Sequence, residues 1–153
     1  MTTKRITFEQ IEDFFSEELD MDRVFHSLER ADYVLLRHIE NISKSRDDDR
    51  VYLRELGESM GVGMQMLSRM ITSVQDKGYV LWLTKEDKSG TYVVLTEGGI
   101  KRIEKEKEEM RETFSKIKRT IPHEDLEITL DTFQKISGII KKQCAKKDTI
   151  ASS

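Results

Sequence analysis

The short stretch from Met64 to Ser73 carries several polar side chains suited to hydrogen bonding with a nucleic acid. A glutamine such as Gln65 can bond the edge of an adenine, and an arginine such as Arg69 can bond a guanine or a phosphate. Serine and threonine hydroxyls can bond either bases or the backbone. The candidate residues on the outward side of this stretch are Met64, Gln65, Ser68, Arg69, Thr72 and Ser73.

The sequence lacks the motifs of catalytic and metal-binding sites. The sequence has no glycine-rich phosphate loop, no nucleophile elbow and no framed pair of acids, so we do not expect an enzyme. Three scattered histidines and one cysteine give no zinc spacing. The acidic run before Arg50 lacks the glycine and the terminal glutamate of a calcium loop. We therefore expect no metal ion and no cofactor.

The single cysteine, Cys144, cannot form an internal disulfide. Lysines on both sides of it favour the thiolate form, which would suit an oxidant sensor. An incidental thiol near a fraying C-terminus is the alternative interpretation.

Two predicted short helices, joined by a tight turn, hold these polar side chains in place. Apolar spacing predicts a helix from about Leu53 to Met60, a break at residues 61–63, and a second helix from Met64 that ends at Lys77-Gly78. Gly57 either allows these two helices to cross closely or is a tolerated helix glycine. The inner face of the second helix is predicted to consist of Leu67, Met70, Ile71 and Val74.

A β-hairpin is predicted directly after the two helices. The stretches 79–83 and 91–95 are rich in β-branched and aromatic residues, and residues 85–90 supply charges and a turn glycine. A helix, a turn, a helix and a hairpin in this order form a winged helix-turn-helix, so the predicted fold is mainly α with a small β-hairpin wing. The candidate contact residues of the wing are Lys85, Lys88, Ser89 and Thr91.

Longer helices are predicted on both sides of this motif. A first helix starts near Phe8 and continues or kinks through residues 20–26, a second spans about 28–42, and a polar loop covers 41–50. Thr96 caps a helix of about six turns, whose charges at 101–112 form a solvated face. Pro122 starts a final helix. We expect one domain over 1–153, with a winged lobe at 29–96 and dimerisation helices at 6–28 and 97–145.

The terminal helices predict a homodimer. They carry more large apolar side chains than one small winged lobe can cover, and an exposed patch of that kind is a liability in a monomer. Twofold symmetry then predicts a pseudo-palindromic binding site. The candidate dimerisation residues are Phe8, Ile11, Phe14, Phe15, Leu126, Leu130, Phe133, Ile136 and Ile140.

Composition indicates a soluble cytoplasmic protein with no membrane segment, because no signal peptide and no long apolar run is present. The net charge of −3 counts against a nucleic-acid partner. Most of the acidity lies in residues 1–50, which hold 8 basic and 13 acidic side chains, whereas residues 51–96 hold 5 of each. This balance keeps open an alternative function, a winged-helix module that binds proteins without touching DNA.

The stretch from Leu53 to Val80 resembles the helix-turn-helix of the MarR family of bacterial transcriptional regulators, and Leu95-Thr96-Glu97 resembles the end of the family's wing. The order of flanking helices is also similar, so the resemblance covers about residues 8–142. It implies a triangular homodimer that binds double-stranded DNA at a pseudo-palindromic operator. It further implies a repressor that a small aromatic or anionic effector releases, through a pocket between the dimer region and the DNA lobe.

The resemblance also assigns roles to single residues. Arg69 stands where such proteins usually have a recognition-helix arginine, and Asp87 matches the acidic residue that braces their wing. Ser89 replaces the arginine expected at the wing tip, and Gly63 replaces the serine that often begins the recognition helix. Because lysine lacks the planar guanidinium fork, we expect this wing to contact the DNA backbone rather than to read bases in the minor groove.

Overall fold

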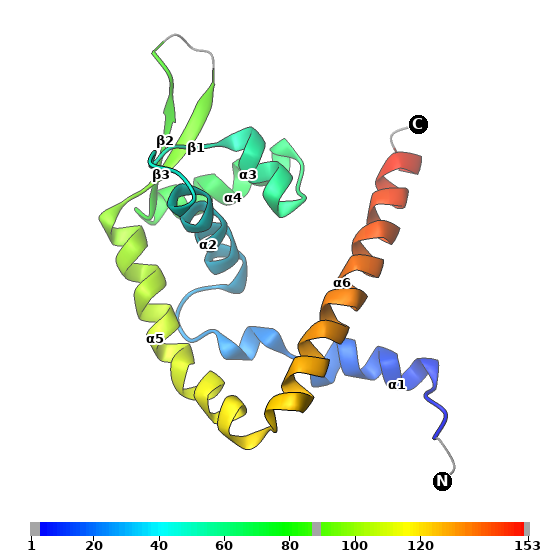
Figure 1. The fold of residues 1–153 in the computed structure, drawn as a ribbon. Helices are drawn as coiled ribbons and strands as arrows, with labels where there is room; N and C mark the ends of the chain where they lie inside the picture. Colours follow the sequence, from blue (N-terminus) through cyan, green and yellow to red (C-terminus); the bar gives the residue numbers. More distant parts are fainter. Residues whose placement is uncertain (1–3, 87–89, 152–153) are drawn as a thin grey trace. The chain divides into compact units, whose positions relative to one another are not determined.

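The computed structural model describes residues 4–86 and 90–151, which form helices and one small antiparallel sheet (Figure 1). The two irregular helical segments after α1 are a π-helical turn, Phe14–Glu18, and a 3-10 turn, Met21–Val24. The regular elements are α1 (Phe8–Asp13), α2 (Arg30–Lys44), β1 (Val51–Tyr52), α3 (Leu53–Met60), α4 (Met64–Asp76), β2 (Val80–Thr84), β3 (Thr91–Leu95), α5 (Glu97–Thr120) and α6 (His123–Ala151).

The chain divides into two compact units, one up to Met110 and one from Arg111 onward. The first unit contains the sheet and the continuous apolar core. The domain boundaries inferred from the sequence stay predictions. Within the described residues, no helix is both long and apolar enough to cross a bilayer.

The core forms where α2, α3 and α4 turn their apolar faces toward one side of the sheet. The predicted inner face of α4 is confirmed, because Leu67, Ile71 and Val74 are fully buried and Met70 is half-buried. The other side of this helix is therefore left for solvent or a partner. The buried apolar side chains of the core are Leu28, Leu35, Leu36, Ile39, Val51, Leu53, Leu56, Leu67, Ile71, Val74, Val80, Val93 and Ile103.

Two glycines in the left-handed backbone region set the turns on either side of α4. Gly61 ends α3 with a φ of 69°, and Gly78 follows α4 with a φ of 82°. Residues with a Cβ rarely adopt this conformation, so glycine is favoured at both places. The turn between α3 and α4 is thus as short as the sequence predicts.

The sheet has three strands in the order β1-β3-β2, one more than the predicted hairpin. Val51 pairs with Val93 on β3, and Trp82 of β2 pairs with the same residue from the other side. The sequence analysis missed β1 because this strand has two residues and runs directly into α3, with no turn between them. Strand β2 also begins one residue later than predicted.

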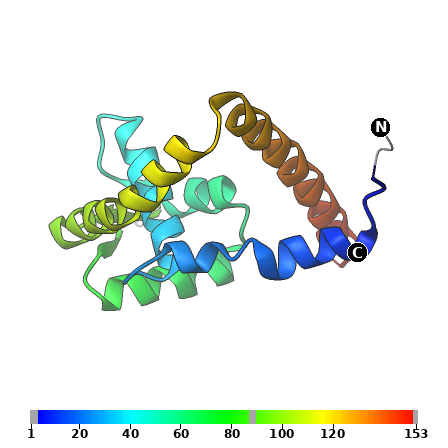
Figure 2. The ribbon, with the colours of Figure 1, turned by 90° about the horizontal axis from the view of Figure 1, so that it is seen from below.

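The N-terminal segment is broken into short pieces rather than forming one rod (Figure 2). Helix α1 lasts six residues, and its N-terminus is capped by Thr7, whose Oγ1 accepts the Gln10 N–H. The π-helical turn then ends at Leu19, which has a non-helical backbone. Of the two predicted possibilities, a kink before residue 26 is therefore the observed one.

Helix α2 ends two residues later than predicted, and α5 is less solvated than predicted. The predicted loop at 41–50 is wrong over its first four residues, because α2 continues to Lys44. The predicted solvated face of α5 is wrong at Glu106, which is fully buried. Glu106 accepts the His26 N–H at 2.7 Å and faces Arg102 at 3.4 Å, so it holds α5 against the segment before α2.

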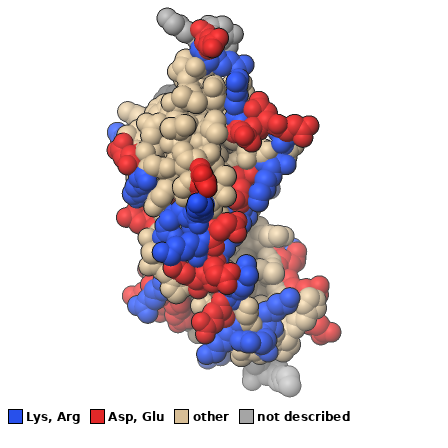
Figure 3. Space-filling view, turned by 90° about the vertical axis from the view of Figure 1, so that its left-hand side faces the viewer, with Lys and Arg blue, Asp and Glu red and all other residues tan. Residues whose placement is uncertain are grey.

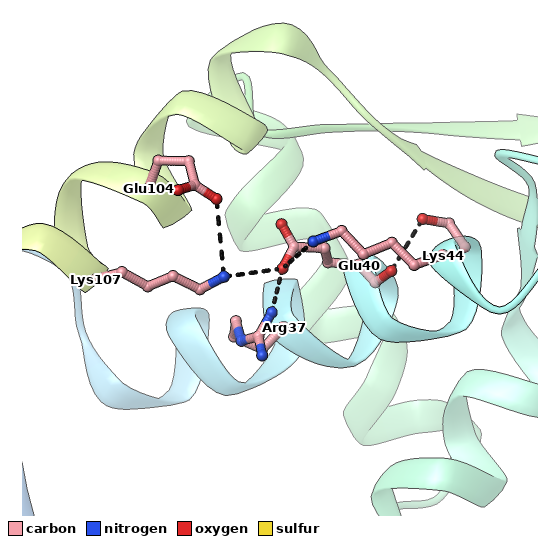
Figure 4. A network of polar contacts seen from close by, with 6 residues as sticks. Arg37, Glu40, Lys44, Glu104 and Lys107 are labelled. Atoms are coloured by element: carbon pink, nitrogen blue, oxygen red, sulfur yellow. Dashed lines mark hydrogen bonds and ion pairs between the residues drawn. The ribbon is translucent and has the colours of Figure 1, made fainter.

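A second carboxylate that links α5 to the core belongs to Glu40 of α2 (Figure 4). Its Oε1 faces the amines of Lys107 at 3.3 Å and Lys44 at 3.5 Å, and also pairs with Arg37. Burial alone would raise the pKa of Glu40, but the hydrogen bond from Lys107 and the three positive charges outweigh burial and lower it. Glu40 is therefore held in its charged form and joins α2 to α5.

The base of the wing is closed by contacts between the end of α4 and the start of α5. The hydroxyl of Thr96 donates to the Gly78 carbonyl at 2.6 Å and accepts the Gly99 N–H at 3.0 Å. The Thr96 N–H donates to the Tyr79 carbonyl at 3.1 Å. A Cβ on Gly99 would lie 2.1 Å from this carbonyl oxygen, closer than any real contact.

We predict that Gly99→Ala lowers the free energy of unfolding by about 1–3 kcal/mol or more, because the added methyl group meets backbone that cannot move without breaking the wing base. Urea unfolding of both proteins measures the difference. Gly98→Ala is the matched control, since its Cβ would meet the nearest atom at an ordinary 3.5 Å. There we expect no loss, or a gain of up to about 1 kcal/mol from helix propensity. Equal stabilities of the two variants would contradict the role given to Gly99.

Candidate nucleic-acid interface

The outward side of α4 is the first part of the candidate interface. Met64, Gln65, Arg69 and Thr72 are exposed, whereas Ser68 and Ser73 are half-buried. Residues four apart lie on one face of a helix, so the outward side forms one continuous strip. The structure thus brings together the whole set that the sequence proposed on this helix.

Two hydroxyls in this strip already donate to the helix backbone. Ser68 Oγ donates to the Met64 carbonyl, and Thr72 Oγ1 donates to the Ser68 carbonyl, both at 2.8 Å. Their lone pairs can still accept hydrogen bonds, but donation to a phosphate would need a rotation of the hydroxyl. Gln65 and Arg69 have no hydrogen bond or ion pair within the described part of the chain, so they are the donors available to a partner.

Helix α4 is braced closely by α3. A Cβ on Gly57 would lie 3.3 Å from the Val62 carbonyl oxygen and 3.6 Å from Leu67 Cδ2, and Gly57 itself is buried. Of the two interpretations of this glycine, close crossing is the one that the geometry favours. The strip is therefore presented by a helix with little freedom to shift.

The wing supplies the second part of the candidate interface. Lys85 directly follows β2 and Thr91 begins β3; both are half-buried, and the Lys85 N–H donates to the Gly90 carbonyl at 2.9 Å. The other proposed wing residues, Asp87, Lys88 and Ser89, lie outside the described residues. Their proposed roles stay predictions.

A cluster of two cations and two tyrosines lies on the sheet near the wing and was not proposed from the sequence. The Lys85 amine is 4.9 Å from the centroid of the Tyr52 ring, and the Arg50 guanidinium carbon is 5.0 Å from the centroid of the Tyr92 ring. The centroids of the two rings are 5.9 Å apart. We call Arg50, Tyr52, Lys85 and Tyr92 the wing-root cluster. The only available signal was the alternation of Arg50 and Tyr52, which the preceding acidic run obscured.

The wing-root cluster lies on the outer face of the sheet, opposite the core. Tyr92 pairs directly with Tyr52 on one side and with Leu83 on the other, and directly opposed residues share a face. Leu81 and Leu83 of β2 are 52% and 41% exposed on this face. Figure 3 shows that the region below the wing tip is mostly uncharged, with charged side chains along its margin.

The proposed dimerisation residues are largely accessible in each unit. In the first unit, Phe8 is 74% exposed, Ile11 and Phe15 are also exposed, and Phe14 is half-buried. In the second unit, Leu130 and Ile140 are exposed and three residues are half-buried, namely Leu126, Phe133 and Ile136. Two further exposed isoleucines of α6, Ile128 and Ile139, were not proposed.

Cys144 is exposed. Among the described side chains there is no group of three or more histidine, cysteine, aspartate or glutamate residues that could hold a metal ion.

We predict that Tyr52 ionises below the ordinary tyrosine pKa of 10.0, because a hydrogen bond from Lys85 and the nearby positive charges favour the phenolate. The difference in phenolate absorbance between the original protein and Tyr52→Phe, followed against pH, measures this ionisation. Lys85→Met should move it upward in pH. Tyr33 gives an internal contrast, since burial raises its pKa. A Tyr52 midpoint that Lys85→Met leaves in place would show that the cluster does not persist in solution.

No protein-family model matches the sequence, and no curated protein matches it. Solved structures do match. A mutant MarR from E. coli complexed with operator DNA has a TM-score of 0.67 at 18% identity, over 86% of this chain and 99% of that chain. The S. aureus MepR–DNA complex has a TM-score of 0.66 at 12% identity, over 88% and 96% of the two chains.

A MarR family protein from Bacillus stearothermophilus is a third match, with a TM-score of 0.59 at 13% identity over 86% of this chain and 91% of that chain. All three similarities extend beyond the winged motif to the helices on both sides of it, since they cover most of every chain. The order of helices and strands is the order that the sequence predicts, with β1 added. The chain has the winged-helix fold of the MarR-family regulators.

Proposed function

We propose that this protein binds double-stranded DNA as a sequence-specific transcriptional regulator, with α4 in the major groove and the wing beside the backbone. The observation that carries this proposal is the outward strip of α4, where Gln65, Arg69 and Thr72 are exposed on a helix that α3 packs against closely. A major groove about 12 Å wide accepts one α-helix whose outward side chains can reach base edges. Two solved structures with this fold, the MarR and MepR complexes, contain DNA.

We further propose that the protein acts as a homodimer on a pseudo-palindromic operator. The exposed aromatic and aliphatic side chains of α1 and α6 support this, because such side chains gain free energy when a second copy covers them. A dimer would present two copies of α4, one for each half-site, at a spacing of about one turn of DNA.

Repression that a small effector relieves is the regulatory part of the proposal. A hollow of about 660 Å³ beside the start of α2 is lined by Phe25 and Arg30, together with the two acids Asp22 and Glu29. Within this lining, Phe25 and Arg30 are the residues that suit an aromatic anion, through ring contact and charge. Binding of benzoate that releases the DNA would support this part of the proposal.

We predict that Arg69→Ala weakens binding to a DNA duplex selected from a random pool by roughly 5- to 150-fold, the loss that corresponds to about 1–3 kcal/mol for one base-contacting arginine. The measurement is a titration of labelled duplex at fixed salt. The mass of the oligomer in solution should not change. Arg69 belongs to the exposed strip of α4 and is not one of the apolar residues proposed for dimerisation.

The control for this experiment is Arg23→Ala, which removes the same charge from a residue whose side chain is 85% exposed and paired with Asp20. It should bind the duplex as the original protein does. If no sequence is selected from the pool and neither the original protein nor the Arg23→Ala control binds DNA, the alternative of a protein-binding winged helix is favoured. If DNA binds equally well to both variants, Arg69 is not part of the interface.

We predict that the double variant Leu130→Glu and Ile140→Glu is a monomer at concentrations where the original protein is a dimer, because burying a carboxylate in an apolar interface is strongly unfavourable. Sedimentation velocity measures the two states. Thr132→Glu adds one such charge at an exposed position of the same helix and should leave the dimer intact. An original protein that is itself a monomer would refute the homodimer.

A further inference from the structure

We propose that Met64 and Met66, in the first turn of α4, read thymine in the major groove through contact with its C5-methyl group. This inference rests on the proposed function, because it names a base that the operator must contain. Met66 was not among the residues that the sequence suggested for the interface, and Met64 was included there without a chemical role.

The first argument is that these two side chains are exposed although they are apolar. Met64 is 50% and Met66 is 53% exposed, whereas the other large apolar side chains of α4 are buried or half-buried. From residue 22 to residue 80, a range that the structure describes throughout, no other large apolar side chain is exposed. Apolar surface gains free energy when it leaves water. The exposed pair therefore favours a ligand that offers an apolar group.

The second argument is the place of the pair on the helix. Successive residues turn by about 100° around an α-helix, so Met64 and Met66 flank Gln65 on either side. When a helix of this kind enters the major groove, the residues near its N-terminus approach the base edges. Arg69 lies one turn further along the same side as Gln65. The two methionines therefore border the polar groups that are proposed to bond bases.

The third argument identifies the apolar group. The base edges of the major groove present hydrogen-bond donors and acceptors at every base pair, and their apolar group is the C5-methyl of thymine. Phosphates are charged and gain nothing from contact with a thioether. Deoxyribose carbons are apolar, but contacts with the sugars carry no sequence information. The unbranched methionine side chain adapts to the surface that it meets, so it suits a single methyl group beside polar base edges.

The fourth argument distinguishes DNA from a partner protein. Arg69 is the one cation of α4, and its one acid, Asp76, stands at the opposite end of the helix from the methionines. A Cβ on Gly57 would lie 3.8 Å from Met64 Sδ, so this sulfur lies beside α3 rather than extending freely from the helix. Two side chains also offer far less apolar area than a stable protein interface buries. A small apolar area beside a cation and uncharged polar groups matches the mixed chemistry of base edges.

The test compares thymine with uracil, which pairs in the same way and lacks only the C5-methyl group. The probe is a duplex that the original protein selects from a random pool, made either with thymine or with uracil throughout. The original protein should bind the uracil duplex at least about 4-fold more weakly, the loss that corresponds to about 0.8 kcal/mol for one buried methyl group. The double variant Met64→Ala and Met66→Ala should lose this preference. Met21→Ala is the control, since it shortens a methionine that is 43% exposed outside α4, and it should keep the preference.

A second measurement needs no variant and serves should the double variant fail to fold. Uracil is placed at one thymine position at a time, and the original protein should lose affinity at particular thymines of each half-site rather than evenly along the duplex.

The outcomes separate this inference from the proposed function. An original protein that selects and binds no duplex refutes the proposed function itself. An original protein that binds the thymine and uracil duplexes equally, or that selects a half-site without thymine, overturns the reading of thymine alone. A preference for thymine that the double variant shares with Met21→Ala comes from the shape of the duplex rather than from α4, and it also overturns this inference.

Discussion

The arrangement of the first unit depends on the junction where the end of α4 meets the start of α5. Thr96 bonds the Gly78 carbonyl with its hydroxyl and the Tyr79 carbonyl with its N–H, and the absent side chain of Gly99 makes room for the same backbone. Strands β2 and β3 leave this point together, so it fixes the direction of the wing relative to α4. Gln75 adds a second tie, since its side-chain oxygen accepts the Trp82 N–H at 2.8 Å. These contacts therefore join the outward strip of α4 to the described strands of the wing.

Buried carboxylates extend these connections to α5. Burial would raise the pKa of Glu106, yet the hydrogen bonds from the backbone of His26 and Ser27 and the charge of Arg102 lower it, as Lys107 does for Glu40. Buried charges of this kind are weak sources of stability, because desolvation offsets most of the attraction, but they fix position well once formed. The first half of α5 is thus tied both to α2 and to the segment that precedes α2. A shift of this segment would pull on α5 through Glu106.

The sequence was most informative where local chemistry determines the structure. The inner face of α4, the positive φ of Gly78 and the cap at Thr96 each depend on residues close together in the chain, and all three are confirmed. Contacts between residues far apart in the chain could not be predicted from the sequence. Glu106 looks like one charge in a solvated row until residues 80 positions away in the sequence bury it. The wing-root cluster escaped for the same reason, because Tyr52 and Tyr92 meet only through the pairing of β1 with β3.

The net charge of −3 is compatible with a polyanionic partner once the location of each charge is known. Much of the acidity of the first unit is balanced internally, as at Glu40, which faces three cations, and at Asp32, which faces one. Helix α4 itself carries a single acid, Asp76, at its last residue. A phosphate backbone that approaches the outward strip therefore meets Arg69 and neutral polar groups rather than carboxylates. Because salt screens exposed charges beyond about 10 Å, acids elsewhere in the chain contribute little repulsion at that surface. Local placement of charge, and not its sum, decides whether this fold can bind DNA.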